Sequence, residues 1–141
     1  MEPSQQKEKV VEAIQVKSKS RVEFVDITSN ITEIVARSGV REGIAIVYVP
    51  HTTAGVTINE AADPAVVQDI NAKLSSLVPH QGNYRHTEGN SDAHIKASLM
   101  GSSVHLIISK GTPVLGTWQG IFFCEFDGPR TRKVLIKILA G

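Results

Sequence analysis

Three histidines occupy positions from which their imidazole groups can share one site. His51 closes the segment GIAIVYVPH, and the polar segment YRHTEGNSDAHIK holds His86 and His94. The end of a buried strand fixes a side chain rigidly at the rim of a fold. Three neutral imidazoles with one open position form the usual catalytic zinc site. Spacing alone favours separate surface or capping residues, since no His-Glu-x-x-His or paired Cys-x-x-Cys pattern is present.

Carboxylates near these histidines in the sequence are candidates to orient the rings. A carboxylate that accepts the second ring N–H of a ligand histidine fixes its tautomer, and those in reach by sequence are Glu60, Asp63, Glu88 and Asp92. His80 follows a proline at a helix end, and His105 alternates with apolar residues in a strand. We interpret these two histidines as structural.

Length and composition indicate one ordinary globular domain. The chain has 141 residues, of which 41% are hydrophobic and 21% charged, and we expect a single domain over residues 1–141. The net charge of +1 and the 5% of aromatic residues argue against a nucleic-acid-binding protein. The single cysteine, Cys124, the polar start MEPSQQKEKVVEA and the short apolar runs predict a cytoplasmic protein without a membrane partner.

Hydrophobic periodicity and turn residues predict the elements that position these side chains. The predicted strands cover residues 9–17, 21–25, 43–49, 54–59, 103–109, 117–126 and 132–139. The predicted helices cover residues 28–39, 63–79 and 92–101. Strands that outnumber helices without a regular alternation are typical of an α+β fold. We therefore expect a mostly antiparallel β-sandwich or barrel-like core with about three inserted helices.

Local signals refine several of these elements. Asp63 and Pro64 have the residue types of a helix cap and first helical position, and Asn30 and Glu33 have capping-box spacing. The strand over residues 43–49 is apolar at nearly every position, which predicts burial on both faces. The glycine- and asparagine-rich stretch over residues 80–91 is a long loop, and long loops in compact domains tend to be functional.

Three blocks of the sequence resemble one known family. HTTAGVTINEAADP, GNYRHTEGNSDAHIKASLMG and GTWQGIFFCEFDGPR are similar, in that order and spacing, to the YjbQ family, described as secondary thiamine-phosphate synthases. The likeness runs from about residue 10 to the C-terminus. It implies an α+β fold with a β-sandwich-like core, a homotrimer, and a divalent-metal pocket around His51, His86 and His94. The metal would be zinc, or Mg²⁺ if the pocket handles a diphosphate.

The resemblance also carries over further site residues. They are Thr52, Thr53, Asn59, Glu60 and Asp63 from the first block, Asn83, Glu88 and Lys96 from the second, and Trp118, Gln119, Glu125 and Arg130 from the third. The segment HTEGNSDAHIK is one or two residues shorter than the family's usual form, which leaves the loop geometry around Glu88 and Asp92 open.

Several of these side chains allow two interpretations. Trp118 could stack on a substrate ring, or it could belong to the core or a subunit interface. Glu125, in an apolar strand, could be a general base or supporting group with a raised pKa, or a solvent-facing strand end. Lys96 and Arg130 suit a phosphate, whereas Arg132 fits a solvated charge run better. Cys124 alternates with phenylalanines and is a core residue rather than a nucleophile.

Three functions fit this set of residues. The first, implied by the resemblance, is thiamine-phosphate synthesis from a pyrimidine diphosphate and a thiazole phosphate. The second is metal-dependent hydrolysis of a small phosphorylated or carbonyl substrate, with Glu125 or Glu60 as the general base. The third is a non-enzymatic trimer that binds a metal or a heterocycle. A pocket that holds one ring rather than two would separate the second from the first.

Overall fold

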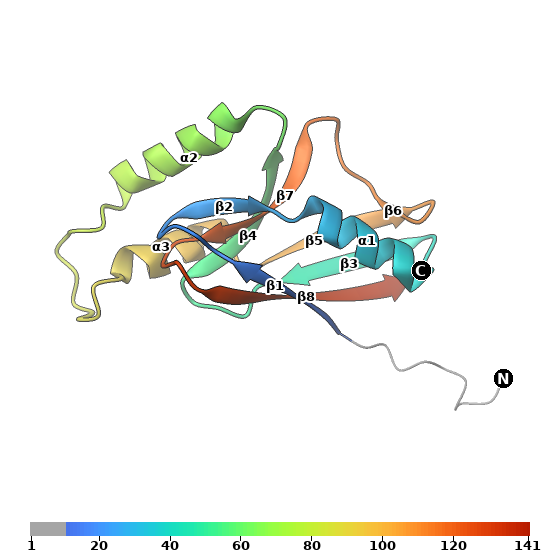
Figure 1. Cartoon of the computed structure of the whole chain (residues 1–141), viewed down its shortest axis with the longest axis horizontal. Helices are drawn as coiled ribbons and strands as arrows, with labels where there is room; N and C mark the ends of the chain where they lie inside the picture. The colour runs from blue at the N-terminus through green and yellow to red at the C-terminus, as the bar shows by residue number, and fades with distance from the viewer. Residues whose placement is uncertain (1–10) are drawn as a thin grey trace.

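Residues 11–141 fold into two antiparallel sheets with three helices (Figure 1). The computed structural model describes residues 11–141, so the start of the predicted strand 9–17 lies outside the described residues. The elements are β1 (Glu12–Lys17), β2 (Glu23–Asp26), α1 (Thr28–Ser38), β3 (Gly43–Tyr48), β4 (Ala54–Glu60), α2 (Pro64–Leu77), α3 (Ser91–Met100), β5 (Ser103–Ser109), β6 (Thr112–Pro113), β7 (Gln119–Glu125) and β8 (Thr131–Ala140).

Two sheets enclose the main core. The larger has the strand order β1-β8-β3-β5-β6 and the smaller has the order β2-β7-β4, and neighbouring strands pair antiparallel. Side chains of both sheets pack together with the apolar face of α1, which presents Ile31, Ile34 and Val35. This arrangement confirms the predicted α+β class with a mostly antiparallel, sandwich-like core.

Helix α1 begins differently from its sequence prediction. The Asn30–Glu33 capping box is wrong, because the helix starts at Thr28 and its N-cap makes no side-chain hydrogen bond. Instead, Asp26 Oδ1 accepts the Thr28 backbone N–H at 2.9 Å. The predicted end is confirmed, since Gly39 adopts a left-handed φ of 74° that favours glycine.

Helix α2 lies on the outside of the smaller sheet, apart from the main core (Figure 1). Its predicted cap is confirmed, because Asp63 Oδ1 accepts the Ala65 N–H at 2.9 Å. Its apolar stripe is only half-buried, with Val67 and Leu74 against the second core cluster, and Leu77 is 64% exposed. Within residues 11–141, no helix has the length and apolar character needed to cross a bilayer.

Strand β3 is covered on one face only, so the prediction of burial on both faces is wrong for the single chain. Residues alternate strictly, with Ala45 and Val47 buried in the core. Ile44, Ile46 and Tyr48 point outward and are 46%, 38% and 45% exposed. The outward positions beside them on β5 and β8 include Ile107 and Leu139. The sheet therefore carries an exposed apolar face.

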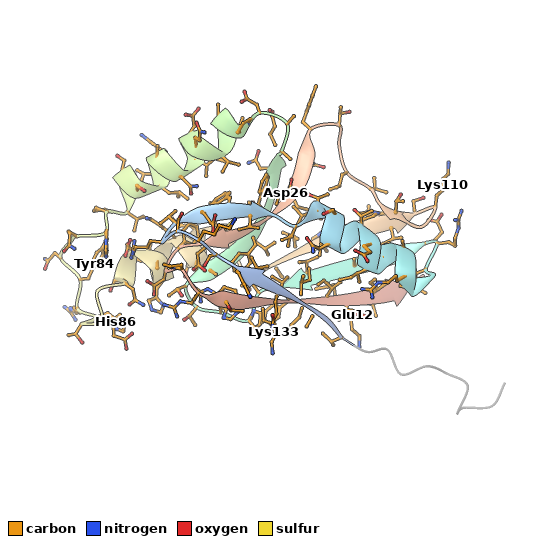
Figure 2. All side chains as sticks on the ribbon, viewed as in Figure 1. Glu12, Asp26, Tyr84, His86, Lys110 and Lys133 are labelled. Carbon is orange, nitrogen blue, oxygen red and sulfur yellow. The ribbon has the colours of Figure 1, made fainter. Side chains whose placement is uncertain are left out.

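Chain segments far apart in sequence meet at one end of the molecule. There β4 begins opposite the last residue of β7, in the pair Ala54–Glu125. The N-terminus of α3 and the loop before it lie at the same end, where Figure 2 shows Tyr84 and His86, opposite Lys110. This end holds the pocket described next.

Candidate functional site

A pocket of about 400 Å³ opens at this end of the fold. Its walls come from the segment after β3, the loop before α3, the first turn of α3 and the segment from the end of β7 into β8. The lining residues are Pro50, His51, Thr52, Thr53, Glu88, Asn90, His94, Asp127, Arg130 and Arg132. The structure thus brings together side chains from all three blocks of the sequence.

A buried ion pair forms the floor of the pocket. Arg132 is almost fully buried and its Nε donates to Glu125 Oε1 at 2.9 Å, while its Nη2 bonds both Glu125 Oε2 and Thr53 Oγ1. Ser18 Oγ donates to Glu125 Oε1 at 2.7 Å. The interpretation of Arg132 as part of a solvated run is wrong, because its side chain points inward from β8.

The raised pKa considered for Glu125 is also wrong. Burial on its own would raise the pKa of this carboxyl. Hydrogen bonds from Arg132, the Asp127 backbone N–H and Ser18 outweigh burial and hold the pKa of Glu125 below its ordinary value. Glu125 is therefore an ionised partner of Arg132 beneath the pocket and not one of its lining residues.

His51 stands on the pocket wall with one ring nitrogen already engaged. The backbone N–H of Lys133 donates to His51 Nε2 at 2.9 Å. Partial burial, together with the nearby Arg132 guanidinium, lowers the pKa of His51 below its ordinary value. The ring is accordingly neutral at about pH 7.

The other two predicted ligand histidines pack against each other. The ring centroids of His86 and His94 lie 5.3 Å apart, edge to face. His86 Nε2 is 3.6 Å from Glu88 Oε2. Within residues 11–141, no three or more histidine, cysteine, aspartate or glutamate side chains gather where they could hold a metal ion. The three histidines therefore share one end of the fold but do not form a ligand set.

A second buried charge cluster, away from the pocket lining, holds Lys96. Its Nζ lies 3.6 Å from Asp92 Oδ2, and Asp92 accepts two hydrogen bonds from Arg21 at 3.0 and 3.1 Å. Burial would raise the pKa of Asp92, but the hydrogen bonds and charge of Arg21 lower it below its ordinary value. Asp92 is therefore a buried anion within α3, and its partners are Arg21 and Lys96 rather than the ring of a pocket histidine.

Five further site candidates lie at the opposite end of the β4–β7 ladder: Asn59, Glu60, Asp63, Trp118 and Gln119. At that end the ladder pairs Glu60 with Gln119, whereas at the pocket end it pairs Ala54 with Glu125. Six residues of extended strand separate the two ends by about 20 Å. Trp118 is 64% exposed in the loop before β7. Within one chain these residues do not reach the pocket.

The last site candidate, Asn83, and the predicted core residue Cys124 have simple positions. Asn83 is exposed in the loop before α3 and does not line the pocket. Cys124 is fully buried beside phenylalanines, and burial raises the pKa of its thiol far above the ordinary value. The core role predicted for Cys124 fits this environment.

Sequence reasoning undervalued or missed several pocket residues: Asn90, Asp127, Arg132 and the supporting Ser18. For Arg132 a signal exists, because it shares the period-2 phase of Val134 and Ile136, which are both buried. An arginine in that phase must point inward and needs an anionic partner. Asn90 and Ser18 carry no such local signal.

The fold and the pocket define a small α+β protein with a polar pocket at one end of a two-sheet core. Residues 12–141 match the family model described as UPF0047 protein YjbQ-like. The chain belongs to this UPF0047/YjbQ family.

Relatives and solved structures agree with this assignment. The chain is 58% identical to the UPF0047 protein MJ1081 of Methanocaldococcus jannaschii, over 89% of this chain and 91% of that protein. It is 46% identical to YugU of Bacillus subtilis, over 92% and 99% of the two chains. A Clostridium acetobutylicum yjbq/upf0047 family structure superposes with a TM-score of 0.90 at 55% identity, covering 91% of this chain and 99% of the other.

A more distant structure gives the same fold. The YbjQ-like protein of unknown function SSO2532 from Sulfolobus solfataricus has a TM-score of 0.89 at 32% identity, over 94% of this chain and 97% of that one. These names state the family and no activity. Thiamine-phosphate synthesis therefore stays a proposal.

Proposed function

We propose that the pocket is the active site of an enzyme that hydrolyses a small phosphorylated or carbonyl substrate. One observation carries the proposal: two imidazoles and two guanidinium groups, from His51, His94, Arg130 and Arg132, converge on a single pocket from separate segments. Such convergence of proton-transfer and oxyanion-binding groups in a concave site is typical of enzymes.

We assign proton transfer to His94. Its ring has no hydrogen-bond partner among residues 11–141, and it lines the pocket from the first turn of α3. Imidazole exchanges protons readily near neutral pH, so His94 suits activation of a water molecule. Glu125 and Glu60 do not serve as the base in this proposal, because one is paired beneath the pocket and the other lies at the far end of β4.

Arg130 is the residue that we expect to hold the substrate. Its guanidinium is half-exposed and makes bonds to Asp127 through Nε and Nη2, at 2.9 and 3.1 Å, which leave Nη1 for a ligand. A guanidinium fixed on one edge is pre-organised to bind an oxygen on the other. Arg130 therefore orients the scissile group toward His94.

Thiamine-phosphate synthesis is the second candidate for the same pocket. It would need two ring substrates at once, and about 400 Å³ lies near the small end of the range for small-molecule sites. Stacking by Trp118 is unavailable within one protomer, since the indole lies at the other end of the ladder. Both points favour a single small substrate.

The divalent metal implied by the resemblance fits this arrangement poorly. No set of three suitable side chains gathers among residues 11–141, and the Nε2 atom of His51 already accepts a backbone N–H. We therefore derive no step through a metal. Metal content remains a direct test, in which stoichiometric zinc lost on His51→Ala would restore the three-histidine proposal.

The hydrolase proposal is tested with a panel of small phosphate and carboxylic esters, assayed with and without added Zn²⁺ or Mg²⁺. We expect turnover that falls about 100-fold in His94→Ala and in Arg130→Ala. Arg37→Ala, an exposed arginine on α1, is the matched control and should keep full activity. Tight retention of a ligand without turnover would favour the binding-protein alternative. Turnover only with the paired pyrimidine and thiazole phosphates would favour the synthase.

We also propose that the protein acts as a homotrimer, with the exposed face of β3 as the contact. Ile44, Ile46 and Tyr48 follow one another along the outer face of β3, and Ile107 and Leu139 flank Ile44. They form an apolar stripe on the larger sheet, with His105 and Lys137 beside Ile46. Contiguous patches of this kind mark association surfaces. In a cyclic trimer a different surface of the next copy covers this patch, because a face that paired with itself would close a dimer. A cytoplasmic location fits the single buried Cys124 and stays an expectation.

Light scattering after size exclusion tests the trimer. We expect three chains of 15.2 kDa per particle. Ile46→Asp should give monomers, because it places a charge at the centre of the patch. Leu77→Asp, on an apolar residue of α2 that is 64% exposed, is the control and should leave the trimer intact. A monomeric wild type would remove the trimer proposal.

A further inference from the structure

The hydrogen bond to His51 fixes the protonation of its ring. Lys133 N–H donates to His51 Nε2 at 2.9 Å, so Nε2 is an acceptor and carries no proton. A neutral imidazole has one N–H and one lone-pair nitrogen. The remaining nitrogen, Nδ1, therefore holds the proton, and His51 presents an N–H donor to the pocket that it lines.

The fold explains why this bond forms. The β3–β8 ladder ends at the pair Tyr48–Leu135, so the N–H of Lys133 has no strand partner on that side. His51 lies just past the end of β3 and supplies the missing acceptor. The bond is solvent-exposed, and it ties the orientation of the ring to the strand.

This tautomer is incompatible with metal binding by His51. A histidine ligand gives one ring lone pair to the metal and keeps its proton on the other nitrogen. Coordination through Nδ1 would put that proton on Nε2, against the Lys133 N–H at 2.9 Å. Two N–H groups cannot face each other at that distance, so the ring would have to leave its position.

A second donor lies beside His51 on the pocket wall. Arg132 uses Nε and Nη2 on Glu125 and Thr53, and its Nη1 has no hydrogen-bond partner among the described residues. The side chain is only 4% exposed and lines the pocket. A guanidinium N–H that faces an open pocket from an otherwise buried side chain is placed to donate to an acceptor of a ligand.

The pocket also contains a buried acceptor without a partner. Asn90 Nδ2 donates to Asp127 Oδ2 at 2.9 Å. This bond fixes which way the amide points, because a carboxylate only accepts hydrogen bonds and the amide oxygen cannot donate one. Asn90 Oδ1 is consequently left buried with no partner in the described part of the chain. A ligand that satisfies this site must itself bring an N–H or O–H group.

We propose that His51 and Arg132 bind an oxygen of a protonated oxyanion, such as hydrogen phosphate or its monoester, whose O–H donates to Asn90. The proposal names the substrate class of the proposed active site and rests on it. Both guanidinium groups already face carboxylates, so recognition depends on matched donors and acceptors rather than on net positive charge. Sulfate, which has no proton to donate at neutral pH, fits the same donors but leaves Asn90 unsatisfied.

The tautomer is tested without any substrate. Long-range proton–nitrogen correlation spectra of the histidine rings should show His51 protonated at Nδ1 only, at about pH 7. Stoichiometric Zn²⁺ should leave the His51 ring signals unchanged. A proton on Nε2, or a zinc-dependent shift of both His51 nitrogens, would overturn the proposal.

Anion titration tests the recognition. By calorimetry, inorganic phosphate should bind about tenfold more tightly than sulfate. His51→Ala should weaken phosphate about tenfold, whereas His51→Asn, which keeps an N–H near the Nδ1 position, should stay within about threefold. Asn90→Ala should abolish the preference for phosphate over sulfate. Equal binding of the two anions by the wild type contradicts the proposal.

Both experiments are independent of turnover. Failure of the ester screen with a confirmed tautomer and phosphate preference would sink hydrolysis and keep the recognition. Turnover without a preference for phosphate would keep the hydrolase proposal and sink the recognition proposal. Circular dichroism of each variant separates loss of binding from loss of the fold, and His51→Asn gives a second test if His51→Ala does not fold.

Discussion

The two ends of the β4–β7 ladder use polar residues in opposite ways. At the end with the pair Ala54–Glu125, Glu125 reaches Ser18 and Arg132, which are 107 and 7 positions away in the sequence. At the end with the pair Glu60–Gln119, each side chain bonds within three positions. One end is a tertiary assembly and the other is a set of local turns.

The local bonds explain the residues at the far end without invoking a ligand. Asn59 Oδ1 accepts the Glu60 N–H at 2.7 Å, and Glu60 Oε2 accepts the Asp63 N–H at 3.2 Å. Gln119 Oε1 accepts the Gly116 N–H at 2.8 Å. Side chains of these types hold turns and helix starts in many folds. A family motif can therefore combine residues of the pocket with residues that only shape the scaffold.

The largest effect is expected from breaking the buried pair. Arg132→Met leaves the Glu125 carboxylate buried without its cation and should lower the free energy of unfolding by about 3–5 kcal/mol. Urea denaturation followed by circular dichroism measures this loss. The double variant Arg132→Met/Glu125→Met should recover most of it, because no uncompensated charge remains. Equal losses in the single and double variants would show that packing, and not charge, dominates.

Acid should destabilise the protein through the buried carboxylates near the pocket. Because the folded-state pKa of Glu125 is lowered, its contribution is fully present above the ordinary value of 4.5 and is lost as the pH falls toward the folded value. The pKa of Asp92 is also lowered, so its contribution to stability is likewise lost as the pH falls below the ordinary value of 3.8. Unfolding free energies measured from neutral to acid pH should therefore decline, and the decline should be shallower in Arg132→Met/Glu125→Met. Parallel curves for the two proteins would contradict this assignment.

A moderate effect is expected at the far end from Asp63→Ala. The change removes the acceptor for the Ala65 N–H at the start of α2 and should cost about 1 kcal/mol of unfolding free energy. Phosphate affinity should not change, because Asp63 follows the far end of β4, whose two ends are about 20 Å apart. A loss of affinity would show that the two ends are coupled.

The smallest effect is expected from Trp118→Ala. The indole is mostly exposed, and the contact of this residue with Ala61 uses its backbone carbonyl, which alanine keeps. Unfolding free energy should change by less than about 0.5 kcal/mol in urea denaturation. Phosphate binding by the same variant should match wild type. Loss of binding would instead place Trp118 at a pocket shared between chains.

Signals confined to a few neighbouring residues predicted the fold class and most elements correctly. Asp63 and Pro64 announce the start of α2, and Gly39 announces the end of α1, because caps and turns depend on residues within one turn of the helix. The alternation in β8 even contains the inward position of Arg132, although the charge run around it suggested solvent. The resemblance placed the three histidines at one end of the fold.

The chemistry of the site was decided only by tertiary contacts. The partner of His51 Nε2 lies 82 positions away, and Asn90 is fixed by an aspartate 37 positions away. No local pattern shows which ring nitrogen of His51 accepts a hydrogen bond. Nor does any local pattern show that the residues of the first and third family-like blocks are divided between the two ends of the β4–β7 ladder. The sequence determined which elements form, because their signals are local. The tertiary structure decided which of their side chains meet, because antiparallel pairing joins segments that are distant along the chain.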